Sequence, residues 1–204
     1  MTVNEMAEEV MKPSKMWVEA GSGDIGKLYF EILSCEALPD MDKRSLRSVD
    51  TTDAFACIVF EDCVVNTDVI NNSENPQWMP WTQRAFVFNI NHPSSQVLLG
   101  IIDYDGALGG ADDAIGRVSI DFSNFLPKTE YCLFYDLYTS GNVDTREKCG
   151  RVQVRLSFEW TAYRRSVLAS LKSPPANFIN LVAKKDFQNA YAACVGTVRP
   201  CPFC

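Results

Sequence analysis

The sequence contains a single histidine, His92, which precedes Pro93 in a turn-like His-Pro-Ser-Ser stretch. Nucleophilic catalysis by a hydroxyl or thiol group needs a base such as histidine within hydrogen-bonding reach, and no nucleophile stands beside this one. The Gly109-Gly110 pair is not a phosphate-binding loop. These absences predict a protein that is not an enzyme.

Long apolar runs are also missing. No stretch reaches the length that a membrane-spanning helix needs, and residues 1–12 are acidic, without the apolar core of a signal peptide. Free thiols in strand-like runs behave as small buried apolar groups, and four of the eight cysteines fall in or beside such runs: Cys35, Cys57, Cys63 and Cys132. We therefore expect a cytoplasmic protein with reduced cysteines rather than a secreted disulfide framework.

Basic residues are scarce in the first 160 positions. The 204-residue chain has a net charge of −7, yet residues 161–204 hold six basic residues against the single acid Asp186, which gives +5. Residues 1–160 therefore carry −12. An acidic body argues against nucleic-acid binding. The basic tail could meet an anionic surface or the acidic face of another protein.

The chain divides into three segments. Residues 1–25 form an N-terminal extension with a short helix, which Thr2 and Glu5 can cap and Pro13 ends. Residues 26–160 show strand patterns throughout. Residues 161–204 form a basic, partly helical C-terminal tail, and Pro174-Pro175 ends its first short helix, expected over residues 166–171.

The middle segment predicts an all-β domain. Apolar and polar residues alternate, most clearly over residues 152–160, which is the period-two pattern of a half-buried strand. A hairpin is expected around Glu61-Asp62. The expected strands cover residues 28–32, 54–60, 64–70, 86–90, 97–103, 115–120, 132–138 and 152–160. Short strands separated by turn residues predict an eight-stranded antiparallel β-sandwich.

The tail from Asn177 onward has apolar residues mostly at three- and four-residue spacing, which predicts a helix capped near Gly196. Three interpretations remain open. This helix packs against the sandwich, docks a protein partner, or lies on a membrane.

Two acidic clusters lie where strand patterns end and loops begin. The first is Asp40, Asp42, Asp50 and Asp53, and the second is Asp103, Asp105, Asp112 and Asp113. Carboxylates this dense repel one another unless a cation lies between them, and Ca²⁺ suits a flexible, oxygen-rich site. The alternative is a pair of solvated acidic loops without metal.

An ordered series of motifs resembles the C2 domain family over residues 26–160. The series comprises Gly26-Lys-Leu-Tyr-Phe-Glu-Ile-Leu33, Ala37-Leu-Pro-Asp-Met-Asp42, Thr52-Asp-Ala-Phe55, Thr67-Asp-Val-Ile70, Asn75-Pro-Gln-Trp78, Phe86-Val-Phe88, Asp103-Tyr-Asp105 and Asp113-Ala-Ile-Gly116. The resemblance implies a sandwich, in the type II strand order, whose loops at one end hold Ca²⁺ and bind phospholipid head groups. Trp78 is expected in the core.

Matched position by position, the resemblance implies five calcium ligands: Asp42, Asp53, Asp103, Asp105 and Asp113. Both acidic loops are longer than is usual in the family, so Asp40, Asp50 and Asp112 are rival ligands. A metal-free variant is also open, in which Lys43, Arg44 and Arg47 neutralise the cluster instead.

Leu46 and Leu108 stand near the tips of the two loops and are expected to contact lipid. Residues 62–70, the strand that often carries a lysine-rich lipid patch in the family, have no lysine or arginine. Cys201 and Cys204 have the spacing of a metal or redox pair or a lipidation signal, or belong to a free tail.

These observations predict a non-catalytic, Ca²⁺-dependent module that binds anionic phospholipid membranes. It is expected in the cytoplasm, peripherally associated with membrane, with a protein partner contacting the C-terminal tail. One alternative is a Ca²⁺-independent docking subunit that keeps the sandwich within a larger assembly. Another is the targeting part of a larger enzyme.

Overall fold

A computed structural model describes residues 3–41, 51–104, 112–139 and 146–173 of the chain. Two helices and nine strands lie within these residues. In chain order they are α1 (Val3–Val10), β1 (Val18–Ala20), β2 (Gly26–Glu36), β3 (Ala54–Phe60), β4 (Cys63–Asn66), β5 (Ala85–Ile90), β6 (Gln96–Asp103), β7 (Asp113–Asp121), β8 (Tyr131–Tyr138), β9 (Lys148–Trp160) and α2 (Tyr163–Ser170). The predicted all-β fold is confirmed, and the short helix expected over residues 166–171 is present as α2. The helix expected from Asn177 onward, and the Cys201 and Cys204 pair, lie outside the described residues.

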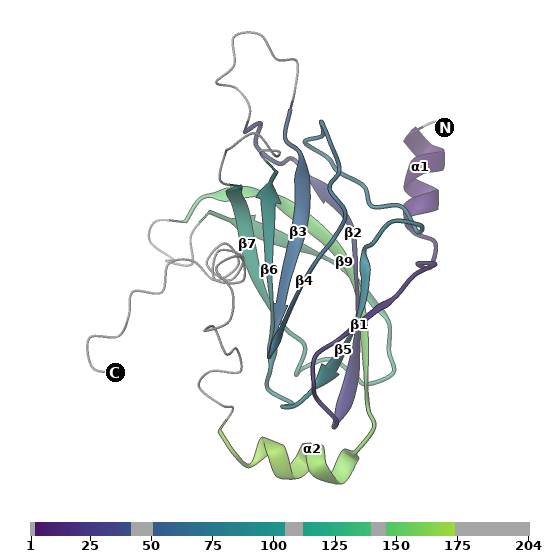
Figure 1. Ribbon diagram of the computed structural model, residues 1–204, viewed down its shortest axis with the longest axis vertical. Helices are drawn as coiled ribbons and strands as arrows, with labels where there is room; N and C mark the ends of the chain where they lie inside the picture. The colour runs from purple at the N-terminus through teal and green to yellow at the C-terminus, as the bar shows by residue number, and fades with distance from the viewer. Residues whose placement is uncertain (1–2, 42–50, 105–111, 140–145, 174–204) are drawn as a thin grey trace, which may run out of the picture.

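The strands form two layers that pack face to face (Figure 1). The hydrogen-bonded order is β1-β5-β2-β9-β8-β7-β6-β3-β4, but β7 and β8 share only the pair Arg117 and Tyr138. That single pair links a layer of β1, β5, β2, β9 and β8 to a layer of β7, β6, β3 and β4. Within the sandwich β2 pairs with β5 and β9 rather than with β3, which is the type II order implied by the sequence.

The ninth strand corrects the expected count of eight. β1 pairs in parallel with β5, in the register Val18 to Phe86, at the edge of its layer. Residues 16–20 have no clear alternation, so the strand forms because the chain is held against β5 and not because of its own pattern. The strand expected over residues 64–70 is also shorter, ending at Asn66, and Ile70 makes an isolated bridge to Ala54.

The core forms between the two layers. The alternating side chains Leu28, Phe30 and Ile32 of β2 lie in it with those of β9, and Trp78 is fully buried as predicted. β3 is buried on both faces, because Phe55, Cys57 and Val59 join a second apolar cluster on its outer side. One sequence expectation is wrong here, since the side chain of Cys132 is exposed.

A buried charged cluster fixes the N-terminal extension to the sandwich. Glu31, Arg84 and Arg155 lie together, with guanidinium-to-carboxylate distances of 3.2 Å from Arg84 and 3.3 Å from Arg155. The two guanidinium groups also donate to main-chain carbonyls of the extension: Arg84 to Val10 at 2.8 Å, and Arg155 to Met11. Residues 10–14 therefore cover part of the outer face of the β2–β9 layer.

No helix within the described parts of the chain is long and apolar enough to span a bilayer.

Candidate functional site

Three strand ends bring aspartates together at one end of the sandwich. β3 starts directly after Asp53, β6 ends at Asp103, and β7 starts at Asp113. These strands are neighbours, and the register pairs Ala54 with Asp103 and Asp103 with Asp113. Residues from both acidic clusters, some 50 positions apart in sequence, thus meet at one edge, which lies at the top of Figure 1.

Asp103 is the buried aspartate at this edge, and a hydrogen bond holds its side chain in place. Its side chain is only 3% exposed, and its Oδ1 accepts a hydrogen bond from the main-chain N–H of Asp53 at 2.7 Å. The main-chain N–H of Tyr104 donates in return to the carbonyl of Asp53 at 2.9 Å. A buried carboxylate needs hydrogen-bond donors or a cation to offset its lost hydration, and the main-chain N–H of Asp53 supplies one such donor.

The side chain of Asp53 is oriented by a loop that the sequence did not single out. Its Oδ1 accepts from the main-chain N–H of Asn72 at 2.7 Å. Asn72 has a positive φ of 56°, a conformation that asparagine tolerates better than most residues. Nothing in the sequence pattern marks Asn72 as a site residue, because the contact is made by its main chain.

The base of the first acidic loop is tied to β3 by Thr52. Its buried hydroxyl donates to the carbonyl of Pro39 at 2.7 Å and accepts from the N–H of Met41 at 3.2 Å. This pair of bonds brings the segment containing Asp40 to the same end as Asp53. Of the two described rival ligands, Asp40 is partly exposed and Asp112 is exposed.

Part of the predicted site lies outside the described residues. This holds for the predicted ligands Asp42 and Asp105, the rival ligand Asp50, the expected lipid contacts Leu46 and Leu108, and the basic residues Lys43, Arg44 and Arg47. Within residues 3–41, 51–104, 112–139 and 146–173, no group of three or more acidic, cysteine or histidine side chains is arranged to hold a metal ion. Carboxylate oxygens are the ligands that Ca²⁺ prefers, so the described aspartates fit this ion in chemistry, but they do not by themselves make up a metal-binding group.

Comparison with known proteins agrees with this architecture. The family model of the C2 domain matches residues 26–137, more than half of the chain. The chain belongs to the C2 domain family. This family model spans β2 to β8 and both acidic clusters, and it stops before β9 completes the layer.

Relatives of this C2 domain are much longer proteins. C2 domain-containing protein 5 of Xenopus tropicalis is 36% identical over 104 residues, which make up 50% of this chain and 9% of that protein. Among solved structures, a C2 domain of plant extended synaptotagmin 1 has a TM-score of 0.55 at 16% identity, covering 68% of this chain and 98% of that one.

A calcium-bound structure of two C2 domains of extended synaptotagmin 2 has a TM-score of 0.52 at 20% identity, covering 68% of this chain and 47% of that one. Structural likeness at such identities establishes the shared fold. The family is one of lipid- and calcium-binding modules in general, and the ligands used by this C2 domain must be argued from its own residues.

Proposed function

We propose that this C2 domain is a non-catalytic module that binds the surface of an anionic phospholipid membrane when Ca²⁺ occupies its acidic end. The observation that carries the proposal is the buried carboxylate of Asp103, in hydrogen-bonding contact with Asp53 and paired in register with Asp113. A hard cation is the ligand that relieves repulsion among such groups. Asp42 and Asp105 would complete the set, with Asp40, Asp50 and Asp112 as rivals.

Bound Ca²⁺ supplies positive charge at an end that is otherwise negative. Residues 1–160 carry a net charge of −12, so the metal-free end repels anionic lipid. Bound Ca²⁺ turns this repulsion into attraction, at about 1 kcal/mol for each charge near the membrane surface. Leu46 and Leu108 would then enter the lipid interface. A cytoplasmic, peripherally membrane-associated protein with a partner at residues 161–204 is consistent with this role.

Calorimetric titration of the full chain with Ca²⁺ tests the metal site. We expect binding in the micromolar to sub-millimolar range. Replacing Asp103→Asn together with Asp105→Asn should weaken it on the order of 100-fold, since each lost attraction of about 1.4 kcal/mol is a factor of ten. Asp121→Asn, at the opposite end of β7, is the matched control and should leave the affinity unchanged. Absence of heat on adding Ca²⁺ would contradict the proposal.

Sedimentation with phosphatidylserine vesicles tests the membrane role. Wild type should bind more vesicles in Ca²⁺ than in EGTA, and Leu108→Asp should remove most of that increment. An increment that survives both Leu46→Asp and Leu108→Asp would overturn the lipid-contact assignment.

A Ca²⁺-independent docking subunit is the second candidate, and the extension held by Arg84 and Arg155 supports it.

A further inference from the structure

α2 is held rigidly against the sandwich by one of its faces. Ser166 is buried and Ala169 packs against the core. At its start, the main-chain N–H groups of Thr161 and Ala162 donate to the carbonyl of Ile25 at 3.0 and 3.1 Å. These contacts determine which sides of the helix face away from the protein.

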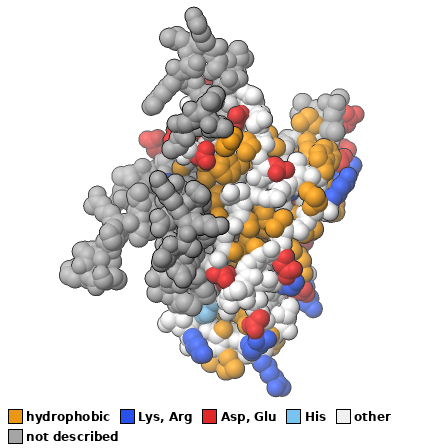
Figure 2. All heavy atoms as spheres, in the orientation of Figure 1, with side chains coloured by type: hydrophobic (Ala, Val, Ile, Leu, Met, Phe, Trp, Pro, Cys, Tyr) orange, Lys and Arg blue, Asp and Glu red, His pale blue; other side chains and the backbone are white. Residues whose placement is uncertain are grey.

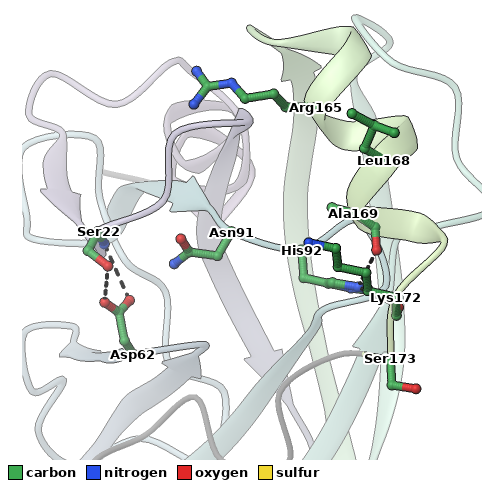
Figure 3. A pocket seen from close by; sticks show the side chains of 9 residues that line it. All are labelled: Ser22, Asp62, Asn91, His92, Arg165, Leu168, Ala169, Lys172 and Ser173. Atoms are coloured by element: carbon green, nitrogen blue, oxygen red, sulfur yellow. Dashed lines mark hydrogen bonds between the residues drawn. The ribbon is translucent and has the colours of Figure 1, made fainter.

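His92 fixes the other end of α2 (Figure 3). Its Nε2 lies 3.0 Å from the carbonyl oxygen of Ala169 and 3.2 Å from that of Lys172, and its Nδ1 accepts from the N–H of Ser94 at 3.1 Å. Because carbonyls only accept, Nε2 carries the proton. The buried imidazole thus caps the last turn of α2, a use of the single histidine that the sequence does not reveal.

The opposite face of α2 is apolar and exposed. Tyr163, Val167 and Leu171 recur at four-residue spacing, so they lie along one side, and Leu168 lies next to them. Their exposed fractions are 70% for Tyr163, 46% for Val167, 79% for Leu171 and 60% for Leu168. Leu168 also lies at the rim of a pocket of about 650 Å³ beneath the helix. Apolar side chains gathered in this way mark an interaction surface.

Basic residues predominate around this face, although Asp24 and Asp62 also lie near it. Residues 161–173 contain Arg164, Arg165 and Lys172 and no acidic residue. Arg165 forms an ion pair with Asp24, whereas Arg164 and Lys172 form none with any described residue. Figure 2 shows hydrophobic atoms at the lower end of the molecule lying between those of Lys and Arg. This combination complements an apolar phase bordered by negative charge.

Two other occupants fit less well. A second copy of the chain placed face to face would bring two cationic helices together, which is repulsive. A stable protein interface needs some 20 to 30 residues on each side, many more than this two-turn surface offers. A bilayer makes no such demand, because a short helix can sink its apolar side chains among the head groups while arginine and lysine reach anionic phosphates.

We propose that α2 binds an anionic phospholipid bilayer without calcium, at the end of the sandwich opposite the acidic edge. In Figure 1 the helix and the strand ends carrying Asp53, Asp103 and Asp113 lie at opposite ends of the molecule. Since both ends cannot lie flat on one planar bilayer, the chain can join two membranes when Ca²⁺ is present. The α2 contact itself is independent of the function proposed for the acidic edge.

Vesicle sedimentation in EGTA tests the α2 contact on the full chain, with phosphatidylcholine vesicles that do or do not contain phosphatidylserine. Wild type should sediment with the anionic vesicles only. Leu168→Asp with Leu171→Asp should weaken binding by about tenfold or more, because two exposed leucines no longer enter the interface. The pair Leu168→Met and Leu171→Met should bind like wild type. Met16→Asp, another exposed apolar position outside α2, is the matched control.

Several results would overturn the inference. These are no binding to anionic vesicles in EGTA, binding unchanged by the paired aspartates, and a wild-type dimer that those aspartates dissociate while vesicle binding stays the same. All the exchanged side chains are exposed, so thermal unfolding should confirm intact folding of each variant. Failure of the Asp103 and Asp105 variants to change calcium binding leaves these results untouched, so the two proposals fail separately.

Discussion

At the scale of single residues, the unexpected feature is charge inside the protein. β9 alternates as predicted, yet Arg155 on its polar side is buried along with Glu31 and Arg84. Burial lowers the pKa of Arg84, while the carboxylate of Glu31 opposes that shift. The cluster is tolerable because nearly every guanidinium donor meets a carbonyl, hydroxyl or carboxylate oxygen.

Removing one member of this cluster should be costly. Arg84→Met leaves the carbonyls of Val10 and Lys12 without their donor and Glu31 with only one buried cation. We expect a loss of about 3–5 kcal/mol in the free energy of unfolding, measured by urea denaturation. The control Arg151→Met removes a surface ion pair with Glu36 and should cost about 0–1 kcal/mol. Equal losses for the two variants would contradict this account.

Cysteine reactivity is also decided residue by residue. Burial, with smaller contributions from Asp62 and Glu61, raises the pKa of Cys63 to about 12. Because only the thiolate reacts, alkylation of Cys63 at pH 8 should be on the order of a thousandfold slower than for a free thiol, and should still accelerate between about pH 9 and 11. Peptide mass spectrometry after iodoacetamide treatment measures this. A rate that levels off near pH 9 would show that the thiol is not buried.

At the scale of elements, a chain of contacts joins the β3–β4 turn to α2. The carboxylate of Glu61 accepts from the N–H groups of Asn91 and His92 and from the hydroxyl of Ser95, and His92 in turn caps α2. The turn therefore supports the helix through the loop between β5 and β6. Neither helix propensity nor the apolar pattern of residues 163–170 contains this information.

Glu61→Ala should break that chain of contacts. Three donors lose their acceptor, so we expect the free energy of unfolding to fall by about 2–4 kcal/mol. Relative to wild type, amide exchange should become faster in α2 by a larger factor than in β2. Alanine keeps the positive φ of 47° at this position as unfavourable as glutamate does, so conformational strain does not change. Asp62→Ala, which removes contacts to the exposed Ser22, is the control and should cost about 1 kcal/mol or less. Unchanged exchange in α2 would disprove the link.

At the scale of the whole molecule, the sheet layers place the acidic strand ends and the basic helix α2 at opposite ends (Figure 1). If Ca²⁺ binds the folded chain alone, stability should rise with its concentration. At 100 times the dissociation constant the gain is about 2.7 kcal/mol, which for this size raises Tm by about 5–10 °C. Differential scanning calorimetry with Ca²⁺, and with Mg²⁺ as the comparison, measures it. The assignment of Ca²⁺ to the acidic end would be contradicted if Ca²⁺ left the Tm of the wild type unchanged, or raised the Tm of Asp103→Asn as much as that of the wild type.

Much of the fold, and the position of the acidic clusters, could be predicted from the sequence. Period-two alternation in residues 26–160 predicted the sandwich, because a strand with one buried face must repeat every two residues. Turn residues placed the acidic clusters at strand ends, and the strand order then had to bring Asp53, Asp103 and Asp113 to one edge. The assignment of these aspartates to Ca²⁺ stays a prediction.

Only the tertiary structure decided the contacts made between segments distant in the chain. β1, the burial of Arg155 and the role of His92 all arise because main-chain carbonyls or a neighbouring strand come to these residues from elsewhere. Local pattern records which face of an element is apolar, since that depends on nearby residues. It does not record which main-chain groups a distant segment will present, because every residue carries the same carbonyl and, proline apart, the same amide N–H whatever its side chain.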